Sequence, residues 1–247
     1  MEKYAAIILA AGKGTRMNEG RASEIPKVMY QLEDKPIIWY AVKSVEEAGI
    51  NKIVLVVGYK KEMVQDFIGD KVEYAEQKEQ LGTGHAVMVT QDVLEGRAEN
   101  IIVFYGDCPL YRPETIKKLI TKYEAKKPTI AMLSVISDDP TGYGRLIRHG
   151  EDVVGIIEHK DCTPEQLQIK EWNPGFYIFE AQWLWDNIDK LQTNNVQKEY
   201  YLTDLIAMAV KQNRKIIAVP VGEENEAIGI NTPEQHKEAE EVLKKGR

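Results

Sequence analysis

A glycine-rich turn with two cations follows the first apolar run of the sequence. In IILAAGKGTRM, Gly12 and Gly14 come directly after apolar residues, and Lys13 and Arg16 stand beside them. The backbone N–H groups of such a turn, here at Ala11, Gly12 and Gly14, can face a polyphosphate, and the two cations add charge that glycine lacks. Taken alone, the stretch is equally consistent with a surface turn that carries two solvated cations. Other parts of the sequence must therefore decide between an anion site and a plain turn.

The spacing within this turn excludes a P-loop and disfavours a dinucleotide-binding turn. A P-loop has four residues between its first glycine and a Gly-Lys-Ser/Thr triplet, and the stretch from Gly12 to Thr15 lacks that spacing. A dinucleotide-binding turn needs a small third residue where Met17 stands. It also needs a ribose-binding acid at the end of the second strand, where Gly58 stands. A triphosphate is the anion that the remaining arrangement fits best.

An aspartate ends a second apolar run. In IIVFYGDCPL, Asp107 lies at the carboxyl end of an expected core strand, which is where open α/β sheets bind ligands. A carboxylate suits Mg²⁺, which usually takes only one or two protein oxygens beside substrate phosphates. The alternative is a turn or N-cap aspartate near Pro109. Asp107 is the best candidate metal ligand in the sequence.

A carboxamide occupies the corresponding place after another expected strand. EQKEQLGTG puts Gln77 at the strand end, and Gly82 and Thr83 in a turn before a helix. A carboxamide offers both a donor and an acceptor, as the edge of uracil does. Alternatively, Gln77 is an exposed polar residue and Gly82 an ordinary turn former. The residues alone leave both interpretations open.

The elements that must position these residues alternate between strand and helix. Short β-branched or aromatic runs are separated by helical stretches of about ten to fifteen residues, which predicts an α/β fold with a largely parallel sheet. Thr163 and Thr232 each open a TPEQ segment with Pro at the first helical position, and this predicts two helix starts. The pattern becomes irregular from about 138 to 172, where we expect an inserted subdomain that covers a sheet edge or crevice. The expected strands include 52–59, 100–107, 129–136, 175–179 and 215–221, and the expected helices include 36–49 and 113–126.

Composition narrows the class of protein. The 247 residues are 43% hydrophobic, enough for one domain with a large core. A formal net charge of -7 argues against a general nucleic-acid or membrane surface, whose footprint is a clustered basic face. Cys108 and Cys162 show no paired spacing for zinc and fit a reducing compartment as structural thiols.

The apolar start of the chain could be taken for a short signal peptide. Glu2 and the brevity of the apolar run weigh against that interpretation. No later apolar segment approaches the eighteen or more residues of a membrane helix. We therefore predict a cytoplasmic protein.

Short motifs run through the chain from the first turn to the last expected helix. They are LAAGKGTRM with IPKV downstream, EQLGTGHA, YGDCPL, TGYGRLI, IIEHKD, WNPGFY, EYYLTD and GIN. In type and order they resemble the bacterial N-acetylglucosamine-1-phosphate uridyltransferases over nearly the whole sequence. The resemblance implies a Rossmann-like nucleotidyltransferase fold with a mostly parallel open sheet and a small inserted sugar-binding subdomain, in one domain over 1–247.

The sequence departs from the family pattern in two places. A few extra residues around NEGRAS lie between Arg16 and Pro26, so positions flanking the phosphate turn are less closely matched. The bifunctional members continue into a hexapeptide-repeat left-handed β-helix that acetylates glucosamine 1-phosphate. No hexapeptide repeat occurs in these residues, so we expect no β-helix domain and no acetyltransferase activity from them.

The resemblance implies transfer of UMP from UTP to N-acetylglucosamine 1-phosphate, which gives UDP-N-acetylglucosamine, a cell-wall precursor, and pyrophosphate. The sugar phosphate is itself the nucleophile, and neither a covalent intermediate nor a general base is required. Mg²⁺ would be held by Asp107 and the side-chain oxygen of Asn231. The implied roles are charge neutralisation by Lys13, Arg16 and Lys27, nucleotide binding at Ala11, Gly12, Gly14, Gln77, Gly82 and Thr83, and sugar binding at Tyr105, Gly106, Gly144, Glu158 and Asn173.

Two other functions stay open at this point. One is a glucose-1-phosphate uridylyl- or thymidylyltransferase of the same fold, although such enzymes resemble LAGGxGTR whereas this chain has LAAGKGTR. The other is a nucleotide-sugar sensor that binds without turnover. A sensor would be expected to lose Arg16, Lys27 or Asp107, and all of these are present.

Overall fold

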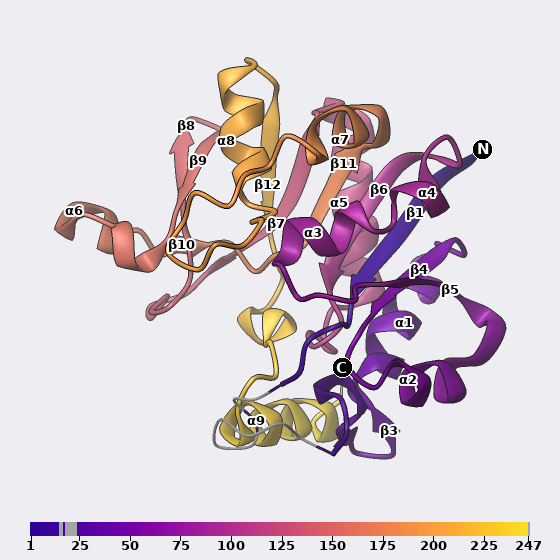
Figure 1. Ribbon diagram of the computed structural model, residues 1–247. Coiled ribbons are helices and arrows are strands. Elements are labelled where there is room, and N and C mark those ends of the chain that lie inside the picture. Colours follow the sequence, from indigo (N-terminus) through magenta and orange to yellow (C-terminus); the bar gives the residue numbers. More distant parts are fainter. Residues whose placement is uncertain (15–16, 18–23, 247) are drawn as a thin grey trace.

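The computed structural model describes residues 1–14, 17 and 24–246 (Figure 1). Its main feature is a ten-stranded sheet in the order β10-β8-β9-β12-β7-β11-β6-β1-β4-β5, and a separate two-stranded sheet pairs β2 with β3. The strands are β1 (Glu2–Leu9), β2 (Gln31–Leu32), β3 (Lys35–Pro36), β4 (Ile53–Val57), β5 (Glu73–Glu76), β6 (Ala98–Tyr105), β7 (Ile130–Ile136), β8 (Arg145–His149), β9 (Asp152–Ile157), β10 (Glu171–Trp172), β11 (Tyr177–Glu180) and β12 (Ile216–Pro220).

Helices cover both faces of the large sheet. They are α1 (Ile37–Glu47), α2 (Lys61–Ile68), α3 (Thr83–Met88), α4 (Gln91–Leu94), α5 (Pro113–Lys126), α6 (Pro164–Leu167), α7 (Ala181–Ile188), α8 (Asp204–Lys211) and α9 (Pro233–Lys244). Short 3₁₀ segments occur at Lys27–Met29, Gly69–Lys71, His159–Asp161 and Glu224–Ala227. None of the described helices is both long enough and apolar enough to span a membrane.

The predicted core strands are confirmed, and β1 lies in the interior of the sheet, two strands from its β5 edge. It pairs in parallel with β4 on one side and β6 on the other, and Ile7 faces both Val54 and Val103. Alternate residues of a strand point to opposite faces. Ile8 accordingly packs into the cluster that contains α1 and α5, whereas Ile7 packs into the cluster that contains α3, α7 and α8 (Figure 1). Both residues are fully buried, so the sequence's first apolar run is a core element.

The sheet is mostly parallel in direction but contains one reversed strand in its middle. β11 lies between β6 and β7 and runs antiparallel to both. The predicted insertion at 138–172 forms β8, β9 and β10, which extend the sheet from β12 and β7 as antiparallel strands. The insertion therefore covers a sheet edge, as expected, by continuing the sheet rather than by forming a separate layer.

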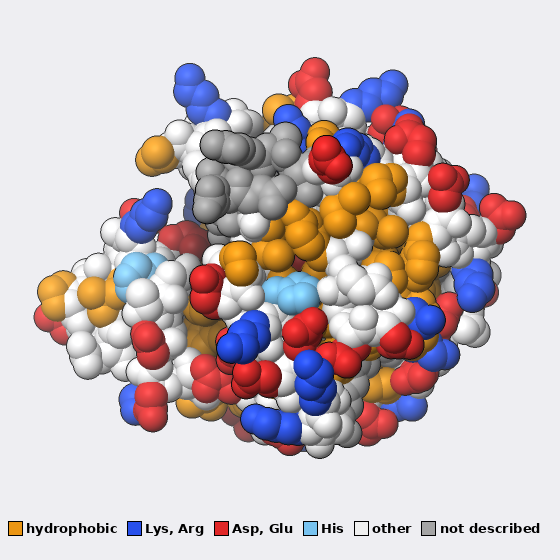
Figure 2. Space-filling view, turned by 90° about the horizontal axis from the view of Figure 1, so that it is seen from below, with side chains coloured by type: hydrophobic (Ala, Val, Ile, Leu, Met, Phe, Trp, Pro, Cys, Tyr) orange, Lys and Arg blue, Asp and Glu red, His pale blue; other side chains and the backbone are white. Residues whose placement is uncertain are grey.

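Both predicted TPEQ helix starts are confirmed. Thr163 caps α6 and Thr232 caps α9, and each forms a capping box with the glutamine three residues on. α9 packs beside β2 and α1 at the lower end of the molecule in Figure 1. The face seen from that end carries a group of hydrophobic side chains (Figure 2). Trp39 and Leu243 are partly buried against the core cluster that α9 shares with α1 and β2.

The parallel strands of the sheet end at one edge. The phosphate-type turn follows β1, Gln77 follows β5, and Asp107 follows β6. Since β5, β4, β1 and β6 are parallel neighbours, these three segments emerge on the same side of the sheet. The topology thus gathers the predicted site residues at the carboxyl ends of the strands.

Candidate active site

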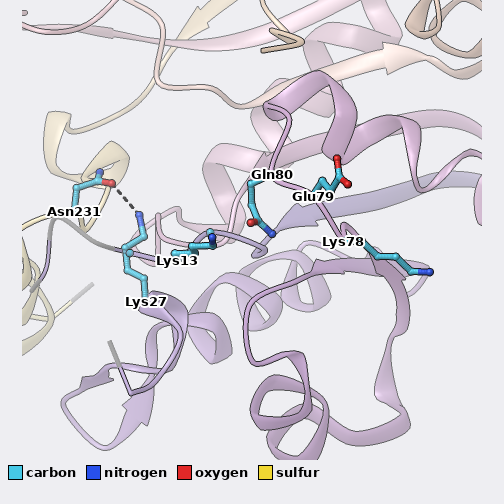
Figure 3. A pocket seen from close by; sticks show the side chains of 8 residues that line it. Lys13, Lys27, Lys78, Glu79, Gln80 and Asn231 are labelled. Carbon is cyan, nitrogen blue, oxygen red and sulfur yellow. Dashed lines mark hydrogen bonds between the residues drawn. The ribbon is translucent and has the colours of Figure 1, made fainter. Parts of the chain in front are cut away.

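The candidate metal ligands Asp107 and Asn231 meet, although they are far apart in the sequence. The ammonium of Lys27 donates to the Asp107 carboxylate and, at 2.8 Å, to Oδ1 of Asn231 (Figure 3). The side chains of Lys27 and Asp107 are only 12% and 17% exposed. A carboxylate oxygen and an amide oxygen therefore converge on one positive charge in a largely desolvated place.

Backbone contacts hold these residues in position. The N–H of Ile230 donates to the carbonyl of Asp107 at 2.9 Å, which ties the segment before α9 to the end of β6. The Asn231 side chain donates through Nδ2 to the Gly229 carbonyl at 3.1 Å. With Nδ2 bonded in this way, Oδ1 is the atom that faces Lys27. The approach of two remote segments explains how Asp107 and Asn231 share one cation.

The glycine-rich turn borders a cavity of about 640 Å³ next to this cluster. Gly14 has a φ of +66°, and a side-chain carbon on it would lie 2.5 Å from Cβ of Lys27, so Lys27 packs directly over the turn. Gly12 lines the same cavity, with open space where a side chain would project. Ala11 is buried, and its carbonyl accepts from Tyr59 at 3.5 Å. The residues lining the cavity are Gly12, Lys13, Gly14, Lys27, Lys78, Glu79, Gln80 and Asn231.

Lysines outnumber acids in the lining of this cavity, although the protein is acidic overall. Among the described residues, three lysines and a single acid line it, whereas the whole chain carries a formal charge of -7. Such a concentration of cations attracts anions by focusing the local field. In Figure 3 the Lys78 side chain points away from Lys13, Lys27 and Asn231. Arg16, the other predicted phosphate-side cation, lies outside the described residues.

The segment after β5 differs from a plain polar turn. Gln77 is 4% exposed, and its Nε2 donates to the Gly82 carbonyl at 3.0 Å beside Nδ1 of His85 at 3.1 Å. Within the described residues its Oε1 has no donor. Gly82 has a φ of +106°, and a side-chain carbon there would lie 2.5 Å from the Tyr200 carbonyl. Gln77 is therefore buried, and its amide is held in one orientation. Position 82 requires glycine because its φ is positive and the Tyr200 carbonyl leaves no room for a side chain.

The turn at Thr83 is hydrogen-bonded to the EYYLTD segment of the chain. The hydroxyl of Thr83 accepts from the N–H of Leu202 at 3.0 Å, and the N–H of Gly84 donates to the Tyr200 carbonyl at 2.8 Å. The 199–204 segment thus wraps the turn that opens α3. The sequence offered no role for this motif beyond its place in the family order, nor for Gln80, which follows Gln77 and lines the cavity.

The predicted sugar-binding residues gather on the other side of Asp107. The carbonyl of Gly144 accepts from the N–H of Asn173 at 2.9 Å, and a side-chain carbon on Gly144 would lie 3.5 Å from the Glu158 carboxylate. Asn173 donates through Nδ2 to the Tyr177 hydroxyl at 2.7 Å and accepts at Oδ1 from Gly175 at 3.0 Å. Its amide thus already has internal partners.

Tyr105 connects the two sides of the candidate site. Burial raises the pKa of its hydroxyl, with a further contribution from the negative charges of Asp107 and Glu158 nearby. Gly175, at a φ of +83°, passes so close that any side chain would overlap the Tyr105 ring. Gly106 instead packs inward, since its N–H donates to the Leu9 carbonyl at 2.9 Å and a side-chain carbon would lie 3.0 Å from Ile38.

Ionisation of two groups in this region is shifted by their surroundings. Partial desolvation, together with the charges of Asp161 and Asp204, raises the pKa of Glu158. Burial and the neighbouring Asp107 carboxylate raise the pKa of Cys108 well above its usual value. A buried thiol of raised pKa is a poor nucleophile, which agrees with the structural role predicted for it. Both cysteines are free.

Known proteins resemble the chain along almost all of its length. The bifunctional protein GlmU of Exiguobacterium sp. is 40% identical to this chain over 247 residues, which cover 99% of this chain and 53% of that protein. GlmU of Geotalea daltonii is 42% identical over 247 residues, with the same coverage of each chain. The chain thus spans about half the length of the curated relatives it matches. The crystal structure of an apo UDP-glucose pyrophosphorylase superposes with a TM-score of 0.82 at 21% identity, over 99% of both chains, and supports the fold. The model of the family "Nucleotidyl transferase" matches residues 5–245, and the chain belongs to that family.

Proposed function

We propose that this chain transfers UMP from UTP to N-acetylglucosamine 1-phosphate, forming UDP-N-acetylglucosamine and pyrophosphate. The observation that carries the proposal is the convergence of Asp107, Asn231 and Lys27 on one point beside the glycine-rich turn. An anion cavity next to an oxygen-lined cation position suits a reaction between two phosphorylated substrates. Two relatives of 40% and 42% identity carry the name bifunctional protein GlmU, in agreement with the family resemblance that implies this sugar.

Asp107 and Asn231 suit a divalent cation. A carboxylate and an amide oxygen are hard oxygen donors of the kind that Mg²⁺ takes, with its remaining positions left for water and phosphate. The Lys27 ammonium between them stands where a cation is favourable. In the loaded enzyme these two residues would hold Mg²⁺, which would offset the charge of the substrate phosphates. Lys27 would then turn to the phosphates, since it already packs over Gly14.

The other residues bind and orient the two substrates. The N–H groups of Gly12 and Gly14 and the cations Lys13 and Arg16 would hold the triphosphate, while Oε1 of Gln77 would accept a hydrogen bond from the base. A phosphate oxygen of the sugar phosphate attacks the α-phosphorus in line, and pyrophosphate leaves. A phosphate monoester is already ionised near pH 7, so no general base is needed. The chemistry depends on positioning and on charge neutralisation.

The sugar would lie on the Tyr105 side. Glu158 would accept from its hydroxyl groups, and Gly144, where a side chain would lie 2.8 Å from Ile156, would bring its backbone close to the acetamido group beside that carboxylate. Asn173 and Gly106 would shape this subsite chiefly through the backbone that they hold. We propose that residues 1–247 act as one uridylyltransferase unit.

Pyrophosphate release from a nucleotide panel tests the proposal. We expect release from UTP, and much slower release from dTTP or CTP, only when N-acetylglucosamine 1-phosphate and a divalent metal are both present. Binding of UDP-N-acetylglucosamine without any release of pyrophosphate would favour the sensor alternative. Faster release from dTTP would favour a thymidylyltransferase.

A further inference from the structure

The capping glutamine of α9 makes one more hydrogen bond than a helix cap requires. Oε1 of Gln235 accepts from the N–H of Thr232 at 3.1 Å, which completes the capping box, and the Gln235 N–H donates back to the Thr232 hydroxyl at 3.3 Å. The same Oε1 also accepts from the N–H of Asn231 at 2.9 Å. This second bond reaches outside the helix to the candidate metal ligand.

A second helix of the same chain shows that the extra bond is not inherent in the motif. α6 begins with the same TPEQ sequence and forms the same capping box around Thr163. There Oε1 of Gln166 accepts from Thr163 at 2.8 Å, and the described structure gives it no bond to the preceding Cys162. α6 lies out on the β8–β10 edge, whereas α9 begins at the candidate site (Figure 1). The bond to Asn231 is therefore specific to the helix next to the site.

The backbone N–H and the side-chain amide of Asn231 are held by different hydrogen-bond partners. Gln235 holds its backbone N–H, and the Gly229 carbonyl holds its side-chain Nδ2. Together these bonds set the direction of Oδ1, which lies 2.8 Å from the Lys27 ammonium. A neutral amide contributes a single oxygen to a cation, so its orientation strongly affects how well it binds. Partners that orient a metal ligand commonly change metal affinity by roughly ten- to a hundredfold when they are removed.

We infer that Gln235 is a positioning residue that keeps Oδ1 of Asn231 directed at the cation site. This inference rests on the proposed function of Asp107 and Asn231 as metal ligands. It predicts that Gln235→Ala weakens cation binding beyond any loss of helix stability. Gln235→Glu retains an acceptor oxygen in the capping-box position and should restore the bond.

Mn²⁺ binding by the full chain, followed by the electron paramagnetic resonance signal of free Mn²⁺ without substrates, tests the inference. Thr232→Ala is the local control, because it breaks the same capping box but leaves Gln235 able to accept from Asn231. Gln166→Ala is the remote control in the identical motif. We expect Gln235→Ala to raise the Mn²⁺ dissociation constant roughly tenfold. Gln235→Glu and both controls should stay within about threefold of the unmodified protein, well below that change.

Thermal denaturation in a chelator separates positioning from folding. Loss of either half of the α9 capping box should lower the melting temperature similarly in Gln235→Ala and Thr232→Ala. Equal weakening of Mn²⁺ binding in these two variants would overturn the inference, since helix loss alone would then explain it. Unchanged binding in a folded Gln235→Ala would also overturn it. Failure of the proposed function is distinguishable, because the unmodified chain would then release no pyrophosphate from UTP.

Discussion

A single methyl group on Gly14 should damage the site far more than the fold. At a φ of +66°, alanine costs about 1–2 kcal/mol of backbone strain. The added carbon would also lie 2.5 Å from Cβ of Lys27, where ordinary contact begins at 3.4 Å. Relief of that overlap requires Lys27 to move by about 1 Å, and misplacement of a catalytic group by that distance can reduce a rate about a hundredfold.

Gly150 provides a matched control for the backbone strain. Its φ of +64° is nearly the same, but a side chain there would meet no atom within 4 Å, and it lies in the β8–β9 turn away from the cavity. Both Gly14→Ala and Gly150→Ala should lower the melting temperature by roughly 2–8 °C. Only Gly14→Ala should also reduce kcat/KM for pyrophosphate release, by about a hundredfold.

The assay is steady-state pyrophosphate release at saturating Mg²⁺, combined with thermal denaturation of each variant. If Gly14→Ala kept its kcat/KM within about threefold of the unmodified chain, Lys27 would not depend on the turn as we argue. If Gly150→Ala lost as much activity as Gly14→Ala, general destabilisation would be the cause instead. Either result would refute the link between this glycine and the catalytic cation.

Three further predictions concern charge at the site. Asp107→Asn and Asn231→Ala should each raise the Mg²⁺ concentration needed for half-maximal activity. Because both residues act through one ion, the double variant should lose much less activation free energy than the sum of the two single losses. Fully additive losses would contradict this. Arg16→Ala should lower kcat by roughly two to three powers of ten with a smaller change in KM, since a cation at this position stabilises the departing pyrophosphate most in the transition state. An increase in KM with unchanged kcat, measured in the same rate assay, would show that Arg16 only binds the substrate. The raised pKa of Glu158 favours folding below the ordinary glutamate pKa, and that contribution is lost as pH rises through the folded-state pKa. Glu158→Gln should therefore raise the melting temperature by about 1 °C at pH 7 and by less near pH 4, while raising KM for the sugar phosphate; an equal rise at both pH values would contradict the shifted ionisation.

Elements with strong local signals were predictable from the sequence. Proline at the first position and an amphipathic pattern give α5 its bounds of Pro113–Lys126, and the two TPEQ boxes give the starts of α6 and α9. The reversed direction of β11 was not predictable in this way. An apolar run gives no indication of strand direction. The antiparallel pairing of β11 with β6 and β7 depends on the end of the sheet at which the chain leaves the preceding insertion.

The candidate site was predictable only in part for a similar reason. Asp107 stood out locally, because a carboxylate after a core strand suggests a ligand position. Asn231 looked like a loop residue before a helix, and only the family resemblance connected it with Asp107. The bonds from Lys27 to both residues, and the bond from Gln235 to Asn231, depend on segments brought together by the tertiary fold. No local pattern in the sequence encodes them.

A competition between sugar phosphates tests the proposed substrate preference of this chain. Limiting UTP is offered to the chain with equal concentrations of N-acetylglucosamine 1-phosphate and glucose 1-phosphate, and the UDP-sugars formed are quantified by mass spectrometry. The product ratio equals the ratio of the two kcat/KM values. We expect UDP-N-acetylglucosamine to predominate by at least about tenfold, roughly the discrimination that one well-placed group provides. A predominance of UDP-glucose, or no UDP-sugar at all, would contradict this expectation.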